Sequence, residues 1–352
     1  MLRLRGMDAF TFARAVTVGR RPVPHPSHVF LCVADHFEPD WRSASVAKQR
    51  ERVARWVDGY RRSVASLSDS RGRPPQHTFF FPMECYRAEW IESLCQLVRS
   101  GHGDIEVHLH HDDDSSGRLH EFLLDSVQRL RDHGLLSADS SGQLRYGFIH
   151  GNWALDNSHP AGRWCGINDE LTILRQTGCY ADFTMPAAPD PAQTRTINSI
   201  YYAIDDPHRP KSHDTGVAAE VGARRVLDGL LMIQGPLLVT QTRFWSKPRV
   251  ENGNLAGTQP PTAERIDDWL RAGVSVKGHE KWSFIKLHTH GAQEQNADML
   301  LGPGMHQFHQ ALKMTAARRS FEYFYVTARE MAQLVIQAEQ GFATPDFDRL
   351  TW

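Results

Sequence analysis

Ionisable side chains follow the apolar, strand-length segments of this sequence with a regularity that indicates a shared site. Six of these segments end in, or are directly followed by, an imidazole or a carboxylate. These residues are Asp35 and His36, Glu84, His108 with His110 and His111, His150, Asp182, and His288 with His290. In parallel β/α folds the carboxyl ends of the strands meet on one face, where the chemistry takes place. Loops that need only solubility do not select imidazole, so we predict one site at these strand ends.

The mixture of histidine and aspartate at these ends predicts a divalent metal ion, most simply Zn²⁺. Neutral imidazole nitrogen and carboxylate oxygen are its usual ligands, and an open position would hold a water usable as a nucleophile. Alternate residues of a strand share a face, so His108 and His110 point one way and His111 points the other. We therefore expect His110, a residue of the acidic loop 112–114 and one group from the first strand to hold the metal.

The elements that must position these residues are alternating strands and helices. Apolar runs predict strands at 28–35, 78–83, 104–111, 146–152, 180–185, 197–204, 282–290 and 321–326, with one or two more in 230–242. Helical spacing covers 53–67, 91–98, 119–130, 169–176, 263–272 and 305–318, and Thr327 with Glu330 forms a capping box that opens a last helix. Near-continuous apolar strands between amphipathic helices predict a mostly parallel sheet covered by helices. No glycine-rich phosphate loop follows the first strand, so a closed or nearly closed barrel is favoured over an open sheet.

The absence of a composition break predicts a single domain of about seven β/α repeats. We divide the chain into an N-terminal extension (1–27), the barrel (28–345) and a short tail (346–352). The extension is basic and lacks the apolar region of a signal peptide, so we interpret it as a tail covering one end of the fold rather than a membrane-surface helix. No apolar stretch approaches the ~20 residues of a membrane span. A cytoplasmic location follows as the default expectation.

Composition excludes some functions. The chain has 40 Lys and Arg residues against 41 Asp and Glu, a formal charge of −1, which argues against binding to nucleic acid through phosphate contacts. The cysteines form no CxxC pair and are odd in number, so we expect reduced thiols that bind neither metal nor each other. They are Cys32, Cys85, Cys95, Cys165 and Cys179.

The ordered motifs resemble those of the polysaccharide deacetylase superfamily, the NodB-homology or carbohydrate esterase family 4 group. Residues 33–36 (VADH) stand where the family has an Asp-Asp pair, and residues 106–110 (EVHLH) match its acidic-aliphatic strand before a histidine. Residues 178–184 and 285–290 match the two later motifs. The third motif differs, because residues 148–153 lack the arginine that the family uses to hold its base.

The resemblance implies a distorted (β/α)7-type barrel and a set of residue roles. The metal ligands would be His36, His110 and Asp114, two of them exchanged in type relative to the family. Asp35 would be the base and His290 the acid, and Asp182 would orient His290. His288, two residues before His290 on the same strand face, is the alternative acid.

The implied function is a metal-dependent hydrolase that removes N- or O-acetyl groups from a carbohydrate. Candidate substrate-binding residues follow strand ends or lie in the polar loop 205–216, which is either a flap or an exposed excursion. They are His150, Asn152, Trp153, His213, Asp214 and His288. Two alternatives remain open. One is a glycoside hydrolase of related barrel fold that uses Asp35 and Asp182 as its carboxylate pair. The other is a degenerate barrel that binds a glycan without turnover.

Overall fold

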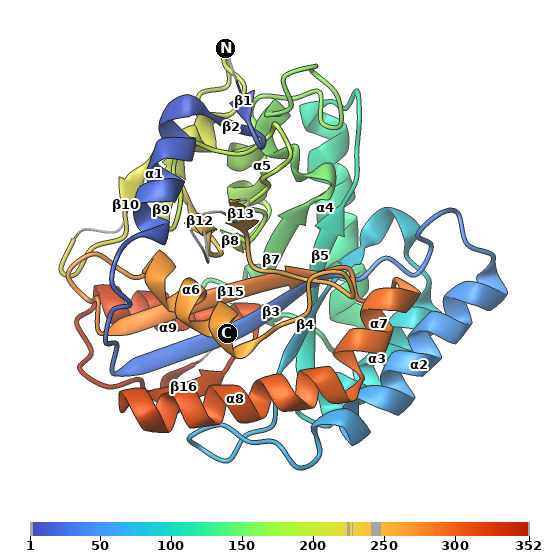
Figure 1. Cartoon of the computed structure of the whole chain (residues 1–352). Coiled ribbons are helices and arrows are strands. Elements are labelled where there is room, and N and C mark those ends of the chain that lie inside the picture. Colours follow the sequence, from blue (N-terminus) through green and yellow to red (C-terminus); the bar gives the residue numbers. More distant parts are fainter. Residues whose placement is uncertain (1–2, 224–225, 227, 241–247, 351–352) are drawn as a thin grey trace.

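The molecule is built on one large, mostly parallel sheet with helices packed around it (Figure 1). The computed structural model describes residues 3–223, 226, 228–240 and 248–350. The spatial order of the main path is β10 (Val217–Ala218), β9 (Ile200–Ile204), β11 (Gly229–Ile233), β8 (Cys179–Asp182), β7 (Leu144–His150), β5 (Gly103–Leu109), β4 (His77–Pro82), β3 (His28–His36), β15 (Trp282–Thr289) and β14 (Asn254–Leu255). Pairing is parallel from β14 to β11 and antiparallel from β11 through β9 to β10. The predicted mostly parallel α/β sheet is therefore confirmed.

Strand β3 lies toward the β14 end of this sheet and has three partners. Its residues 28–35 pair with β15, residues 28–31 pair with β16 (Glu322–Tyr325), and residues 34–36 pair with β4. A short strand, β6 (Ser137–Ala138), pairs with β7. Two small sheets join β1 (Arg3–Leu4) to β2 (Met7–Asp8) and β12 (Leu238–Thr240) to β13 (Arg249–Glu251).

The expected closed barrel is not what the described strands form. Across the residues that the structure describes, β10 and β14 do not pair, so the sheet keeps two edges. The chain reverses direction at β9, which pairs antiparallel with β11. It reverses again at β10, which pairs antiparallel with β9 and ends the sheet on the side opposite β14. In place of a closing pair of strands, the side chain of Lys286 in β15 spans part of the protein interior toward β8. Its buried Nζ donates a 2.7 Å hydrogen bond to the carbonyl oxygen of Phe183, just past the end of β8.

The helices cover the sheet because its strands alternate between two apolar faces. Val29, Leu31 and Val33 of β3 belong to one core cluster with the buried faces of several helices, and Phe30 and Cys32 belong to another with the last helix. The helices are α1 (Ala9–Gly19), α2 (Val46–Val64), α3 (Ala88–Arg99), α4 (Ser116–Asp132), α5 (Glu170–Gln176), α6 (Ala263–Ala272), α7 (Glu294–Leu300), α8 (Pro303–Arg319) and α9 (Ala328–Glu339). Short 3-10 turns are η1 (Met83–Cys85), η2 (Gly151–Trp153), η3 (Leu155–Asn157), η4 (Ser212–Asp214) and η5 (Phe347–Arg349).

Most of the predicted elements are confirmed, including the capping box of Thr327 and Glu330 that opens α9. The segment 230–242 contains two strands, β11 and β12, and residues 241–242 lie outside the described residues. None of the helices in the described ranges is both long and apolar enough to cross a bilayer.

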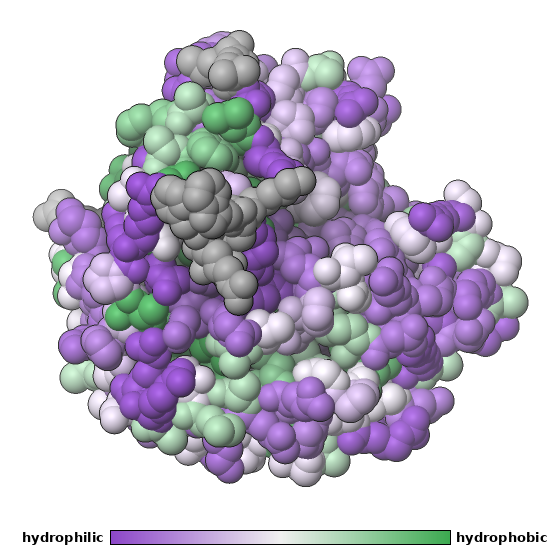
Figure 2. Space-filling model, viewed as in Figure 1, coloured by the Kyte–Doolittle hydropathy of each residue, from purple (hydrophilic) through white to green (hydrophobic). Residues whose placement is uncertain are grey.

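The N-terminal extension, expected to be a tail, contains helix α1. A Cβ atom on Gly19, at the end of α1, would lie 2.0 Å from the carbonyl oxygen of Val239 in β12, so only glycine allows this close approach. Figure 2 shows apolar side chains gathered over the region of α1, on a face that is otherwise mostly polar.

Candidate metal centre

Four side chains at or just past the ends of β3 and β5 bring potential ligand atoms together, and we call them the mouth cluster. It consists of His36, Glu38, His108 and His110. The first three offer ligand atoms that all lie within 4.8 Å of one another. The His108 ring lies 4.9 Å from the His36 ring and 4.5 Å from the His110 ring, between centroids. The sequence prediction that His108 and His110 lie on one side agrees with this arrangement.

Hydrogen bonds fix the orientation of the two imidazoles on β5. His108 Nδ1 lies 2.8 Å from the carbonyl oxygen of Ile149, so this nitrogen is the donor, and Nε2 faces Glu38 Oε1 at 3.2 Å. His110 Nδ1 lies 2.6 Å from Glu84 Oε1, and its Nε2 faces the same Glu38 oxygen at 3.4 Å. Metal-bound histidines commonly donate their other N–H to a carbonyl or carboxylate in this way. Two Nε2 atoms thus converge on one carboxylate oxygen.

The charge state of the cluster suits a cation. Burial lowers the pKa of His36 well below its ordinary value, and neighbouring imidazoles lower it further, so this ring is neutral. Burial opposes ionisation of Glu38, but hydrogen bonds from His108 and His110 outweigh it and hold the pKa far below the usual range. Burial also lowers the pKa of His110, yet hydrogen bonds to Glu38 and Glu84 raise it to about 10. A divalent ion would take the place of that imidazolium proton.

A pocket of about 460 Å³ adjoins the mouth cluster. The His290 ring stacks on the His36 ring with centroids 4.7 Å apart, and Trp153 lies 5.9 Å from each of these two rings. His288 lies 6.3 Å from His36, also between ring centroids. The pocket is lined by Trp153, residues 187–191, Asn252, Asn254, His288 and His290. The indole, amide and imidazole groups that line the pocket therefore lie next to the mouth cluster.

Asp35 faces away from the mouth cluster, although it adjoins His36 in sequence. Its carboxylate is fully buried, with Oδ2 2.8 Å from His77 Nε2 and Oδ1 accepting a 2.6 Å hydrogen bond from the backbone nitrogen of Gly291. Successive strand residues point to opposite faces, which explains the separation of Asp35 from His36. The contacts of Asp35 hold the backbone beside His290.

Asp182 is buried and bonded to its own neighbour. It accepts a 2.7 Å hydrogen bond from the Thr184 hydroxyl, whose oxygen accepts another from the backbone nitrogen of His150 at 2.9 Å. Burial raises the Asp182 pKa to about 7, although Thr184 and the charge of Lys286 oppose the shift. The Asp182 carboxylate is thus connected to the end of β7 through Thr184.

Asp114 and His111 lie together, apart from the mouth cluster. Asp114 Oδ2 lies 3.0 Å from His111 Nδ1, and Oδ1 accepts a 2.9 Å hydrogen bond from Arg118 Nε. His111 Nε2 lies 3.1 Å from Glu170 Oε1. These contacts do not bring Asp114 to His36 or His110, the two ligands expected to accompany it.

The polar loop 205–216 is anchored rather than free in its second half. The backbone nitrogens of Lys211 and Ser212 donate to Asp156, and residues 207–210 are exposed. His213 is fully buried, and neither of its ring nitrogens has a hydrogen-bond partner among the described residues. Asp214 accepts a 2.8 Å hydrogen bond from the Arg195 backbone nitrogen. Asn152 sits in the turn η2 with a positive φ of 54°.

Two residues of the site received no role from the sequence. Glu84 was among the strand-end residues that predict the site, but it was not named as a ligand or as a residue that orients one. Glu38 follows the end of β3, and this position was the signal that could have assigned it a role. Cys165 was expected to stay away from any metal, yet its Sγ lies 3.4 Å from Glu170 Oε2, in a second group of potential ligands.

Comparison with known proteins gives distant similarity only. No protein-family model matches the chain, and no curated protein is significantly similar to it in sequence. Among solved structures, a protein from Mycobacterium smegmatis described as a "putative polysaccharide deacetylase" is similar over 92% of this chain and 96% of that one. The identity is 12% and the TM-score 0.44, too low to establish the fold or the activity of this chain.

Proposed function

We propose that the chain is a metal-dependent hydrolase that removes an acetyl group from a carbohydrate. The observation that carries the proposal is the convergence of His108 Nε2 and His110 Nε2 on Glu38 Oε1, at 3.2 and 3.4 Å, beside a pocket. Ligand atoms on a tetrahedral ion with bonds of about 2.0–2.1 Å are separated by about 3.3–3.4 Å. Glu38 therefore replaces Asp114 in the proposed ligand set, with His108 and His110. His36 lies beside these three, and the fourth position of the ion stays open for water.

A metal held there would polarise an acyl oxygen and lower the pKa of water. The chain's own residues supply the remaining functions. Burial lowers the pKa of His290, and Glu38 and Asp35 partly oppose the shift, so the ring is neutral near pH 7. Its stacking on His36 places it beside the proposed ligands. A neutral imidazole can accept the proton of the attacking water and pass it to the leaving amine or alcohol.

The pocket supports a polyhydroxylated substrate. Asn252 and Asn254 contribute amides to its lining, and Trp153 contributes an indole. Amide groups offer both donors and acceptors to hydroxyls, and an indole gives an apolar face with one polar atom. The carbonyl oxygen of Ala188 accepts a 2.8 Å hydrogen bond from the Asn252 amide, which fixes one side of the pocket.

The glycosidase alternative is less well supported. It needs two carboxylates that flank the scissile bond. Asp35 and Asp182 are both buried, and each carboxylate is bonded to neighbouring protein groups. The glycan-binding alternative without turnover predicts the same metal and pocket, so only catalysis separates it from the proposed hydrolase.

The test combines metal content with acetate release. Protein purified without chelator should contain metal and release acetate from an acetylated amino sugar or an O-acetylated glycan. His110→Ala should lose acetate release and the metal of the mouth cluster, and Glu84→Gln should weaken metal binding at that cluster about 10–100-fold, because Glu84 orients His110. Glu89→Gln, an exposed change on α3, is the control. Metal binding without acetate release from any substrate would favour the glycan-binding alternative.

A further inference from the structure

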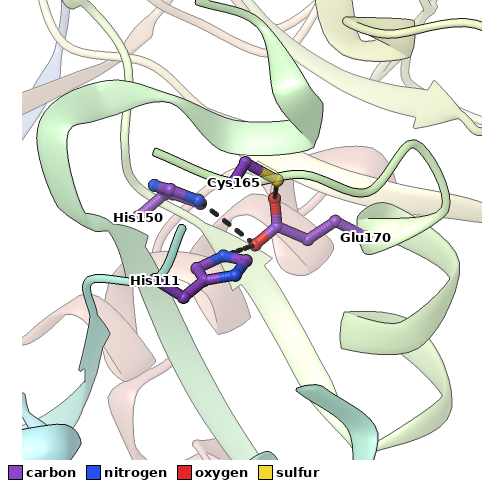
Figure 3. Close-up of side chains that lie close together, drawn as sticks. All are labelled: His111, His150, Cys165 and Glu170. Carbon is purple, nitrogen blue, oxygen red and sulfur yellow. Dashed lines mark hydrogen bonds and ion pairs between the residues drawn. The ribbon is translucent and has the colours of Figure 1, made fainter. Parts of the chain in front are cut away.

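A second group of potential metal ligands lies beyond the mouth cluster, and we call it the inner cluster. It consists of His111, His150, Cys165 and Glu170, whose ligand atoms all lie within 4.8 Å of one another. Figure 3 shows the two imidazoles and the thiol directed at the Glu170 carboxylate from different segments. His150 ends β7, His111 follows β5, Cys165 lies in the connecting loop, and Glu170 opens α5.

The distances match those of a tetrahedral ion. Glu170 Oε1 lies 3.1 Å from His111 Nε2 and 3.5 Å from His150 Nε2, and Glu170 Oε2 lies 3.4 Å from Cys165 Sγ. Ligands at about 2.0–2.3 Å from Zn²⁺ would be separated by about 3.3–3.8 Å. The four side chains therefore need only small adjustments to surround one ion.

Among the described residues, hydrogen bonds do not satisfy every polar atom of the inner cluster. His150 Nδ1 contacts the Gly151 carbonyl oxygen, which can only accept, so this nitrogen carries the proton. His150 Nε2 then has a free lone pair, is fully buried, and has no hydrogen-bond partner among the residues that the structure describes. It faces a carboxylate, which offers no proton either. A buried nitrogen without a partner costs free energy, which a cation between the two groups would remove.

The surroundings resemble those of a bound metal. His111 Nδ1 lies 3.0 Å from Asp114 Oδ2, so Asp114 can orient this ring while its Nε2 binds the ion. Thiolate, carboxylate and two neutral imidazoles carry a charge of −2, which a divalent ion cancels. Charge cancellation matters here because Cys165, His150 and Glu170 are all fully buried.

We propose that the inner cluster is a structural Zn²⁺ site with all four positions filled by protein, distinct from the mouth cluster. Sulfur, nitrogen and oxygen donors together select zinc, and four protein ligands leave no position for substrate. The ion joins the loop 151–169 to the ends of β5 and β7. Because the same loop carries Trp153, the site also holds one wall of the pocket in place.

Cobalt substitution tests the proposal without relying on activity. Only the inner cluster contains sulfur, so Co²⁺ added to the metal-free chain should give a near-ultraviolet thiolate-to-cobalt charge-transfer band. The band should saturate with one equivalent bound at this site. Cys165→Ser should lose the band, whereas Cys85→Ser, which changes the cysteine nearest Glu84, should keep it. Glu38→Gln should also keep it, since that change affects the mouth cluster.

Two outcomes would overturn the proposal. One is wild-type protein saturated with Co²⁺ that shows no such band, a result that needs no variant to fold. The other is a band that survives Cys165→Ser or disappears in Cys85→Ser. Failure of acetate release would leave these measurements unaffected, so the zinc site and the hydrolase activity are tested separately.

Discussion

The carboxylate of Asp35 lies 2.6 Å from the backbone nitrogen of Gly291, the residue that follows His290. A Cβ atom at position 291 would come within 2.1 Å of the same carboxylate, so the contact requires glycine. Trp56 Nε1 donates a 2.9 Å hydrogen bond to the Gly291 carbonyl oxygen. Hydrogen bonds thereby hold both backbone polar groups of the residue next to His290, and Asp35 acts as a positioning residue.

We expect Asp35→Asn to keep the metal and to lower kcat less than His290→Ala does. Asparagine can still accept from Gly291, but it loses the charge beside His77. Stability should fall by about 1.5–3 kcal/mol, the worth of a hydrogen bond to a charged group. Metal analysis, denaturant unfolding and kinetics would measure these effects. Loss of metal would make Asp35 a ligand, and a kcat as low as that of His290→Ala would restore the base role implied by the family resemblance.

Glu38→Gln should abolish metal binding at the mouth cluster, whereas Asp114→Asn should not. The reason is that Glu38 Oε1 contacts two imidazoles there, while Asp114 contacts His111 and Arg118. Both changes should be made in a Cys165→Ser chain, so that only one site contributes, with metal counted per chain by mass spectrometry. The reverse pattern would support the ligand set expected from sequence.

His290→Ala should keep the ion and lose about 10²–10⁴-fold in kcat, as expected for a positioned proton-transfer group. His288→Ala should lose much less, because His290 stacks on His36 at 4.7 Å whereas the His288 ring lies 6.3 Å away. The curve of kcat against pH should be bell-shaped for the wild type, and one of its two limbs should be flatter for His290→Ala. An inactive His288→Ala beside an active His290→Ala would exchange the two roles.

Asp182 should make the stability of the fold depend on pH. Burial raises its pKa from 3.8 to about 7 in the folded chain, so folding favours the protonated carboxyl. Its contribution to stability is full below pH 3.8 and is lost as pH rises through 7. Relative to Asp182→Asn, the wild type should lose up to about 1.4 kcal/mol per pH unit across that window. Urea unfolding of both chains between pH 4 and 8 measures this, and parallel curves would contradict it.

The sequence predicted the strand ends well because hydrophobic spacing determines where strands stop. His36, His108, His110, His288 and His290 were all expected at one face, and the structure brings their rings together. The general position of the site therefore follows from local pattern.

Contacts between distant segments were not predictable in this way. The direction of the Asp35 side chain depends on His77 and on Gly291, which is 256 positions away. Cys165 was set aside because no second cysteine stands near it, but its partners come from β5, β7 and α5. The edge of the sheet at β10 arises from β9 and β10, whose antiparallel pairing is not encoded in apolar spacing.

The three partners of β3 have a consequence for how the chain folds during synthesis. β3 is made early, at residues His28–His36, and β4 follows soon after, but β15 and β16 are among the last segments to be made. Until then one edge of this fully buried strand has no neighbour, a state open to pairing with other chains. Because ordering β3 against β15 requires closure of a very long loop, folding should be slow and should begin only once translation is nearly complete.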